Sequence, residues 1–401
     1  MILFSPTRHV ALPPEAWDPG RVRTWLERWA AETLAARDRQ GWPMHPRDAS
    51  DSDDSDPPGL LQCLYLGACG VWLALARAAA AGFCRLPASL PEIFAQVLED
   101  HHSCSPGAGE RVPSWFLGES ALLTFCCLAR PDAQRADRLA EMIRGNRANP
   151  TREALWGAPG TMLGALFLHE ATGDERWAEL IRDSAAALWE SWVHDEARGA
   201  WLWEQDLYGR RVHYLGAGHG WAGNLYPLWR ARALLSPEQQ AQLRARTLQG
   251  LDRLAVIDGD LANWPAQTEP PPKPLVQWCH GAPGMITSLR HAELPEALPL
   301  LLQGARLIVA AGPLAKGVGL CHGTDGNGAA LLEVYRRTQD AFWLERAREL
   351  AMWALAQSEA ELHRAGQWRY SLWTGDAGLA CFLLDCLDGQ SRGMPGLDSL
   401  W

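Results

Sequence analysis

The chain has 401 residues, of which 47% are hydrophobic and 21% charged, so it can bury a sizeable core. Its formal net charge is −10 and no basic stripe interrupts this balance, which argues against a nucleic-acid surface and against attraction to anionic membranes. No apolar run approaches the roughly 18 residues of a membrane span, and no secretory segment follows Met1. With ten cysteines, few for this length, we predict a reduced cytoplasmic protein whose cysteines are core residues or metal ligands.

The first predicted helix begins near Pro19, and Trp25 and Trp29 fall on its apolar face. Residues 48–58, which read DASDSDDSDPP, carry five aspartates and no large apolar side chain. We predict that this segment is a solvated, mobile loop rather than a cation site, because its carboxylates have no regular ligand spacing. The helix and loop are expected to pack on a repeat-built domain, which gives two parts with the boundaries 1–58 and 59–401.

Beyond this loop, a pair of small residues spaced three apart recurs seven times, each time at the start of an apolar segment. The pairs are Gly67/Gly70, Gly118/Ala121, Gly157/Gly160, Gly220/Gly223, Gly281/Gly284, Gly323/Gly326 and Gly375/Gly378. Their first members lie 39 to 63 residues apart. Each unit is expected to be a helix, a turn and a second helix, with the small residues at the head of the first helix.

A second recurring pattern supports this alignment of the repeats. The segments Thr172–Trp177 and Thr338–Trp343 begin twelve residues after Gly160 and Gly326, and in both a Thr and an Asp are suited to start an amphipathic helix. At the matching point of another unit, Ser236 precedes a proline that fits the first helical position. Seven such pairs could stack as an open solenoid or close into a ring. We favour an all-α, α,α-barrel, because only small residues let helix starts converge on a crowded centre.

A Cys-His-Gly-x-x-Gly signature occurs twice, at Cys279-His280 and at Cys321-His322. Thiolate and neutral imidazole are the ligands that zinc prefers. We predict that Cys279, Cys321 and His322 hold zinc and leave one coordination position open, as in a catalytic site. Because His280 follows Cys279 as His322 follows Cys321, spacing alone also permits a closed, structural Cys2His2 site.

Three further residues are candidates for chemistry. His219 lies just before the fourth turn, where its ordinary pKa suits proton transfer near neutrality, although a histidine that only caps a helix is the alternative. Glu153 lies four residues before Gly157, at the corresponding rim of the third unit. Lys316 could bind an anionic group of a substrate.

These motifs resemble those of the lanthionine cyclase family, LanC, and more closely those of its stand-alone LanC-like branch. The matching segments are LGAGHGWAG at 215–223, WCHGAPG at 278–284, LCHGTDGNG at 320–328 and SLWTGDAG at 371–378. The resemblance covers the chain from about residue 59 onward. It implies an α,α-toroid of seven inner and seven outer helices. It also implies zinc on Cys279, Cys321 and His322, and an acid/base role for His219.

Four positions separate this chain from the peptide-cyclising members that it resembles. His280 stands where those members usually have tyrosine, and Glu153 stands where they have aspartate; both residues match the LanC-like branch. Lys316 matches that branch's lysine, which is linked to glutathione binding. Thr374, just before Gly375, stands where an acidic residue is common. The resemblance therefore implies that Lys316 and His280 bind substrate.

The implied reaction is zinc-dependent thioether formation. A zinc-activated thiol would add to a dehydroalanine or dehydrobutyrine residue, with His219 protonating the α-carbon and Glu153 assisting. The thiol would belong to glutathione or to a peptide cysteine, and Lys316 and His280 favour glutathione. The dehydrated peptide or protein would be made by another enzyme. The alternatives are a non-catalytic regulator that binds zinc and glutathione, an α,α-barrel prenyltransferase, and a glycoside hydrolase with carboxylates from Glu119, Glu153, Asp325 and Asp376.

Overall fold

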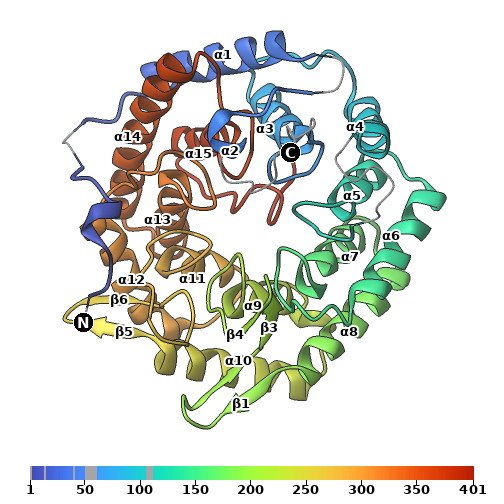
Figure 1. Cartoon of the computed structure of the whole chain (residues 1–401), viewed down its shortest axis with the longest axis vertical. Helices are drawn as coiled ribbons and strands as arrows, with labels where there is room; N and C mark the ends of the chain where they lie inside the picture. The colour runs from blue at the N-terminus through green and yellow to red at the C-terminus, as the bar shows by residue number, and fades with distance from the viewer. Residues whose placement is uncertain (1, 13–14, 39–40, 50–60, 105–111) are drawn as a thin grey trace. The chain divides into compact units, whose positions relative to one another are not determined.

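The structure, a computed structural model, describes residues 2–12, 15–38, 41–49, 61–104 and 112–401 (Figure 1). These residues form fifteen α-helices and three two-stranded antiparallel hairpins. They divide into two compact units. The first unit comprises Met1–Pro6, Pro113–Phe116 and Pro131–Ala311, and the second comprises Thr7–Val112, Leu117–Arg130 and Gly312–Trp401.

Seven helices begin at the small-residue turns and are largely buried. Six of them have the first glycine of the turn as N-cap; these are α3 (Ala68–Ala80), α7 (Ala158–Thr172), α9 (Trp221–Arg230), α11 (Ala282–Ser288), α13 (Thr324–Thr338) and α15 (Asp376–Asp388). The seventh, α5 (Ser120–Ala129), is capped by Glu119, one residue beyond the predicted position. The predicted helix starts are therefore present in all seven sequence repeats.

The second glycine of these turns has a local reason to be glycine. A Cβ atom on Gly160 would lie 2.1 Å from the carbonyl oxygen of Ala154, and one on Gly378 would lie 2.3 Å from that of Leu372. Gly284 meets the oxygen of Trp278 at 2.1 Å in the same way. In each case the oxygen lies six residues earlier, in the same turn. The glycine is thus required for the turn to fold back on its own helix, a cause that sequence spacing alone did not suggest.

Amphipathic helices pack against these buried helices. They are α4 (Leu90–Cys104), α6 (Ala133–Asn146), α8 (Glu175–Glu190), α10 (Pro237–Leu254), α12 (Leu298–Ala311) and α14 (Ala341–Ala365). Asp174 and Asp340 cap α8 and α14 through their side chains, as predicted. Ser236 caps α10 and forms a capping box with Gln239. None of the helices in the described ranges is both long and apolar enough to cross a membrane.

The first unit also contains the three hairpins. They pair β1 (Val193–Asp195) with β2 (Ala200–Leu202), β3 (Gln205–Leu207) with β4 (Arg210–Val212), and β5 (Val256–Asp258) with β6 (Leu261–Asn263). Asn263 joins the last hairpin to α11, because its side-chain oxygen accepts a hydrogen bond from the backbone of Ala282 at 2.9 Å. Short 3₁₀ turns lie at Pro6–Arg8, Arg232–Leu234 and Pro295–Ala297.

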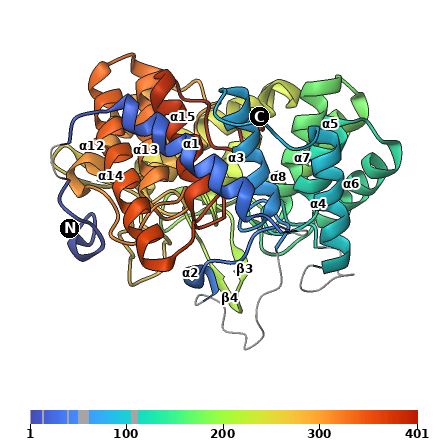
Figure 2. The ribbon, with the colours of Figure 1, turned by 90° about the horizontal axis from the view of Figure 1, so that it is seen from above.

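In the second unit, α1 (Pro19–Ala36) packs on α3, α14 and α15 (Figures 1 and 2). Its apolar face includes Trp25 and Trp29, as predicted, and the ring of Trp25 meets that of Trp368 edge to face at 5.4 Å. The short helix α2 (Pro46–Ala49) follows. Asp48, predicted to start a solvated loop, instead lies in α2 and is 6% exposed. Residues 50–58 of that predicted loop lie outside the described residues.

Candidate active site and metal ligands

Glu153 and His219 form a buried pair in the first unit. The Glu153 side chain has no solvent exposure, and its Oε2 atom lies 2.8 Å from Nδ1 of His219. The same carboxylate accepts hydrogen bonds from the backbone N–H groups of Leu155, at 2.9 Å, and Trp156, at 2.6 Å. A carboxylate can only accept, so the geometry assigns the Nδ1 proton to His219 as donor. Nε2 is then the ring nitrogen that can exchange a proton with another molecule.

The surroundings of His219 favour its charged form. Burial lowers the pKa of this imidazole, but the hydrogen bond and negative charge of Glu153 act in the opposite direction, as does the charge of Cys279 when it is a thiolate. Their combined effect raises the pKa of His219 above its ordinary value. The pair is therefore suited to carry a proton near neutral pH.

Two amide side chains hold the Glu153 turn in place, and the backbone of this turn is strained at Arg152. Arg152 has φ of 42°, in the left-handed region that residues other than glycine rarely adopt. Its carbonyl oxygen accepts a hydrogen bond from Nδ2 of Asn224 at 2.9 Å and one from Nε2 of Gln205 at 3.4 Å. Because Asn224 belongs to α9, the helix that follows His219, these bonds fix the two turns relative to each other. Sequence reasoning missed both amides; their only signal is a polar side chain within an apolar segment.

The Cys279 turn rests on the glycine-rich segment that carries His219. The backbone N–H of Gly218 donates to the carbonyl oxygen of Cys279 at 3.3 Å. A Cβ atom on Gly216 would lie 1.8 Å from that oxygen, and one on Gly218 would lie 2.9 Å from the Cβ of Cys279. The glycines before His219 therefore admit the backbone of the Cys279 turn. Nε2 of Gln277 lies 3.0 Å from the sulfur of Cys279, a further contact that the motif did not reveal.

His280 lies beside the Glu153–His219 pair. Its ring centre is 5.9 Å from that of His219 and 5.6 Å from that of Tyr214. Burial lowers the pKa of His280. The negative charge of the Cys279 thiolate raises it, and the positive charges of His219 and Lys273 lower it further. His280 is therefore a neutral imidazole at neutral pH. Its Nδ1 atom is buried without a hydrogen-bond partner among the described residues.

The second unit contains Cys321 and His322 in the turn before α13. The backbone N–H of Cys321 donates to the carbonyl oxygen of Trp373 at 2.9 Å. Within the same turn, Oδ2 of Asp325 accepts from the backbone of Gly319 at 2.7 Å. Nε2 of His322 is buried and has no hydrogen-bond partner in the described part of the chain. A buried nitrogen of this kind is costly unless something else binds it, which fits a ligand to a metal ion.

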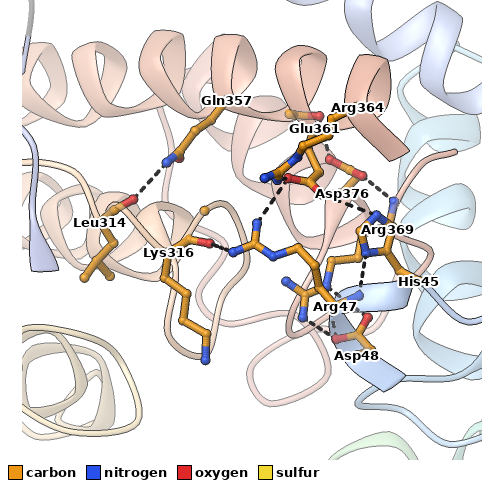
Figure 3. A network of polar contacts seen from close by, with 12 residues as sticks. His45, Arg47, Asp48, Leu314, Lys316, Gln357, Glu361, Arg364, Arg369 and Asp376 are labelled. Atoms are coloured by element: carbon orange, nitrogen blue, oxygen red, sulfur yellow. Dashed lines mark hydrogen bonds and ion pairs between the residues drawn. The ribbon is translucent and has the colours of Figure 1, made fainter. Parts of the chain in front are cut away.

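Lys316 lies at the edge of a charged network in the second unit (Figure 3). Its carbonyl oxygen accepts a hydrogen bond from Arg47, while its amino group points away from that network (Figure 3). Glu361 pairs with Arg47 at 3.2 Å and also with Arg364. A cavity of about 350 Å³ lies among these groups. The structure thus leaves the Lys316 amino group exposed, where it could contact an anion.

Asp48 and Arg369 form the buried end of this network. Each side chain is 6% exposed, and Nε of Arg369 lies 2.9 Å from Oδ2 of Asp48. Thr374 donates from its hydroxyl group to Oδ1 of Asp48 at 3.0 Å. The prediction of solvated carboxylates is therefore wrong for Asp48, because a buried guanidinium ion needs a paired acid. That acid comes from α2, which lies far away in the sequence.

The predicted site residues are thus divided between the units. Glu153, His219, Cys279 and His280 lie close together in the first, whereas Lys316, Cys321 and His322 belong to the second.

The sequence model of the family described as "Lanthionine synthetase C-like protein" matches residues 62–398. The chain belongs to this family. This LanC-like chain is 29% identical over 256 residues to "Glutathione S-transferase LANCL1" of Danio rerio. It is 30% identical over 260 residues to "LanC-like protein GCL1" of Arabidopsis thaliana. Both matches cover 61% of the LanC-like chain, and they span 61% and 57% of those relatives' own lengths.

The solved structure of nisin cyclase has the same fold as the LanC-like chain. It matches with a TM-score of 0.59 and 13% sequence identity, over 93% of this chain and 95% of that one. The likeness confirms the predicted fold class, an all-α α,α-toroid. The two relatives confirm the resemblance to the stand-alone LanC-like branch.

Proposed function

We propose that this LanC-like protein forms thioethers by adding a thiol to a dehydroalanine or dehydrobutyrine residue. The observation that carries the proposal is the Glu153–His219 pair, bonded at 2.8 Å and lying against the Cys279 turn. Membership of the lanthionine synthetase C-like family supports a reaction of this type.

Cys279, Cys321 and His322 are the residues that we propose as zinc ligands. Two thiols and an imidazole are a donor set that zinc favours. The buried Nε2 of His322, which has no hydrogen-bond partner within the described ranges, fits that role. When bound, zinc would keep the substrate thiol in its nucleophilic thiolate form. Three protein ligands would leave a position for that thiol.

His219 would supply the proton that the reaction needs. Attack of a thiolate sulfur on the β-carbon moves negative charge onto the adjacent carbonyl oxygen, which forms an enolate. Protonation of the α-carbon then completes the thioether. Glu153 holds Nδ1 of His219, so Nε2 is the atom that would donate this proton. The raised pKa of His219 supports this role, because it keeps the imidazole protonated to higher pH.

Glutathione is the thiol that we favour over a peptide cysteine. The name of the Danio rerio relative, a glutathione S-transferase, supports this choice. Lys316 is our candidate for binding a carboxylate of glutathione, because its amino group is exposed and points away from the charged network (Figure 3). His280, a neutral imidazole beside His219, is our candidate for a second contact with substrate.

The test compares the wild-type protein with the His219→Asn variant. We expect the variant to keep its zinc and to bind glutathione, yet to form thioether at least about a hundredfold more slowly, since general acid–base help is typically worth about 10² to 10⁴ in rate. Mass spectrometry of a dehydroalanine peptide incubated with glutathione gives the rate. The uncatalysed addition must be subtracted.

Two results would count against this proposal. A His219→Asn variant as fast as wild type would remove His219 from the mechanism. Wild-type protein that never exceeds the uncatalysed rate with any thiol would favour the non-catalytic regulator that binds zinc and glutathione.

A further inference from the structure

The turn of the β3–β4 hairpin departs from two general preferences, one for the residue type at positive φ and one for the burial of aromatic side chains. Its two turn residues, Tyr208 and Gly209, have φ of 53° and 69°, the pattern of a type I′ turn. Asn, Asp or Gly normally occupies the first of these positions, because a larger side chain is strained at positive φ. Tyr208 is also 65% exposed, although an aromatic side chain is ordinarily buried. The residue therefore contributes little to the stability of the hairpin.

The base of the hairpin is fixed to the turn that carries Glu153. The backbone N–H of Asp206 donates to the carbonyl oxygen of Pro150 at 3.0 Å. The buried side chain of Gln205 donates to Arg152 and accepts from the backbone of Tyr214 at 2.7 Å. The tip of the hairpin is thus held at a defined place relative to Glu153.

At that place, Tyr208 contacts two residues of the candidate active site. Its ring meets that of His219 edge to face, with 6.0 Å between the centres. Its hydroxyl oxygen accepts a hydrogen bond from the indole of Trp156 at 3.2 Å. Trp156 is itself fixed, since its backbone N–H donates to Glu153 and its carbonyl accepts from Asn146 at 3.0 Å. Tyr208 and Trp156 form an aromatic rim beside the His219 imidazole.

We propose that this aromatic rim binds the dehydroamino-acid residue of the substrate. The inference rests on the proposed function and names the part of the site that recognises the electrophile. A dehydroalanine residue is a flat, conjugated group with no polar side chain, so aromatic surfaces suit it better than hydrogen-bonding groups do. Its α-carbon must approach His219, and the rim lies against that imidazole. The strain at Tyr208 persists because the ring is needed at this position.

The experiment measures binding of a dehydroalanine peptide by calorimetry in a His219→Asn background, where turnover does not consume it. Adding Tyr208→Asn removes the ring but keeps a residue that tolerates positive φ, so the fold is retained or stabilised. We expect the dissociation constant to rise about tenfold or more, and glutathione binding to stay unchanged. Tyr208→Phe keeps the ring and should bind within about threefold of the parent.

Val193→Asn is the control, because it replaces an apolar side chain of similar exposure, 63%, on another hairpin by the same polar residue. It should leave the dissociation constant unchanged. Equal binding with and without Tyr208→Asn, equal losses in Tyr208→Phe and Tyr208→Asn, or no binding by the parent would each overturn the inference. Binding that depends on Tyr208, together with wild-type protein that forms no thioether above the uncatalysed rate, would instead contradict the proposed function and leave the binding role of the rim standing.

Discussion

At the scale of single residues, strain is concentrated at the candidate active site. Among the described residues, three that are not glycine have positive φ: Arg152, Tyr208 and Gln339. Gln339 simply ends helix α13. Arg152 precedes Glu153, and Tyr208 contacts His219. Such conformations cost roughly 1–3 kcal/mol each and persist where the surroundings impose them. Two of the three thus support the same buried pair.

A buried acid in the second unit predicts a dependence of stability on pH. Burial raises the pKa of Asp376 to about 6, although hydrogen bonds from Ser358 and from the Arg369 backbone favour its ionised form. In the unfolded chain this carboxyl ionises near its ordinary value, so the folded state holds an extra proton between about pH 4 and pH 6. Stability should therefore fall as pH rises through this window, by at most about 3 kcal/mol from this group.

The Asp376→Asn variant checks this prediction, because asparagine does not titrate. The stability of the variant relative to wild type should rise between about pH 4 and pH 6 and stay level above, as measured by urea unfolding. Asp325, whose pKa burial also raises, is present in both proteins, but the charge of Asp376 contributes to that shift. The pH-dependent difference therefore reports the titration of Asp376 together with its coupling to Asp325. A difference that does not change with pH would contradict the prediction.

At the scale of elements, the small-residue turn is the repeated unit of the fold. In six of the seven turns the first glycine caps the helix, and the second small residue, as at Gly160, Gly284 and Gly378, packs on a carbonyl oxygen of its own turn. Because both requirements are local, the turns recur although their separations vary from 39 to 63 residues.

We expect Gly378→Ala to lower stability by about 1–3 kcal/mol, because its Cβ atom would lie 2.3 Å from the Leu372 oxygen and 3.0 Å from Leu320. Gly145→Ala is the control: it lies in α6 with nothing within 4 Å of its Cβ position, so alanine should be neutral or slightly stabilising. Scanning calorimetry gives the melting temperatures. A Gly378→Ala protein that melts no lower than the Gly145→Ala protein would contradict this explanation of the turn.

The parts of the fold that could be predicted from the sequence are those with a local sequence signal. Asp174, Asp340 and Ser236 act as caps within one turn of chain, so their patterns predicted the starts of α8, α14 and α10. The β3–β4 hairpin was not predicted, because Tyr208 occupies a position where asparagine would have been the signal. Residues paired across the fold, such as Asn224 with Arg152, leave no pattern in one sequence.

At the scale of the whole molecule, the proposed zinc site can be tested on the intact chain. We expect about one zinc per chain, which Cys321→Ala should abolish and His280→Ala should largely retain. The reason is that His280 lies beside His219 and Tyr214, where we propose that it meets substrate. Both His280 and His322 have a buried ring nitrogen without a partner among the described residues, so the zinc content of the variants is what separates the open site from the closed one. Elemental analysis of the purified variants measures this. Loss of zinc in His280→Ala as complete as in Cys321→Ala would instead indicate the closed, structural site.

The pairing of Asp48 with Arg369 has a consequence for the order in which the chain can fold. These residues are 321 positions apart, and Trp25 meets Trp368 over a similar separation. During synthesis at about 5–20 residues per second, α1 and α2 therefore wait roughly 15 to 60 s before their partners leave the ribosome. During that interval, the face of α1 that carries Trp25 lacks the C-terminal part of the surface on which it packs. The second unit can thus close only late in translation, and until then the surfaces of α1 and α2 that pack on the C-terminal residues stay uncovered.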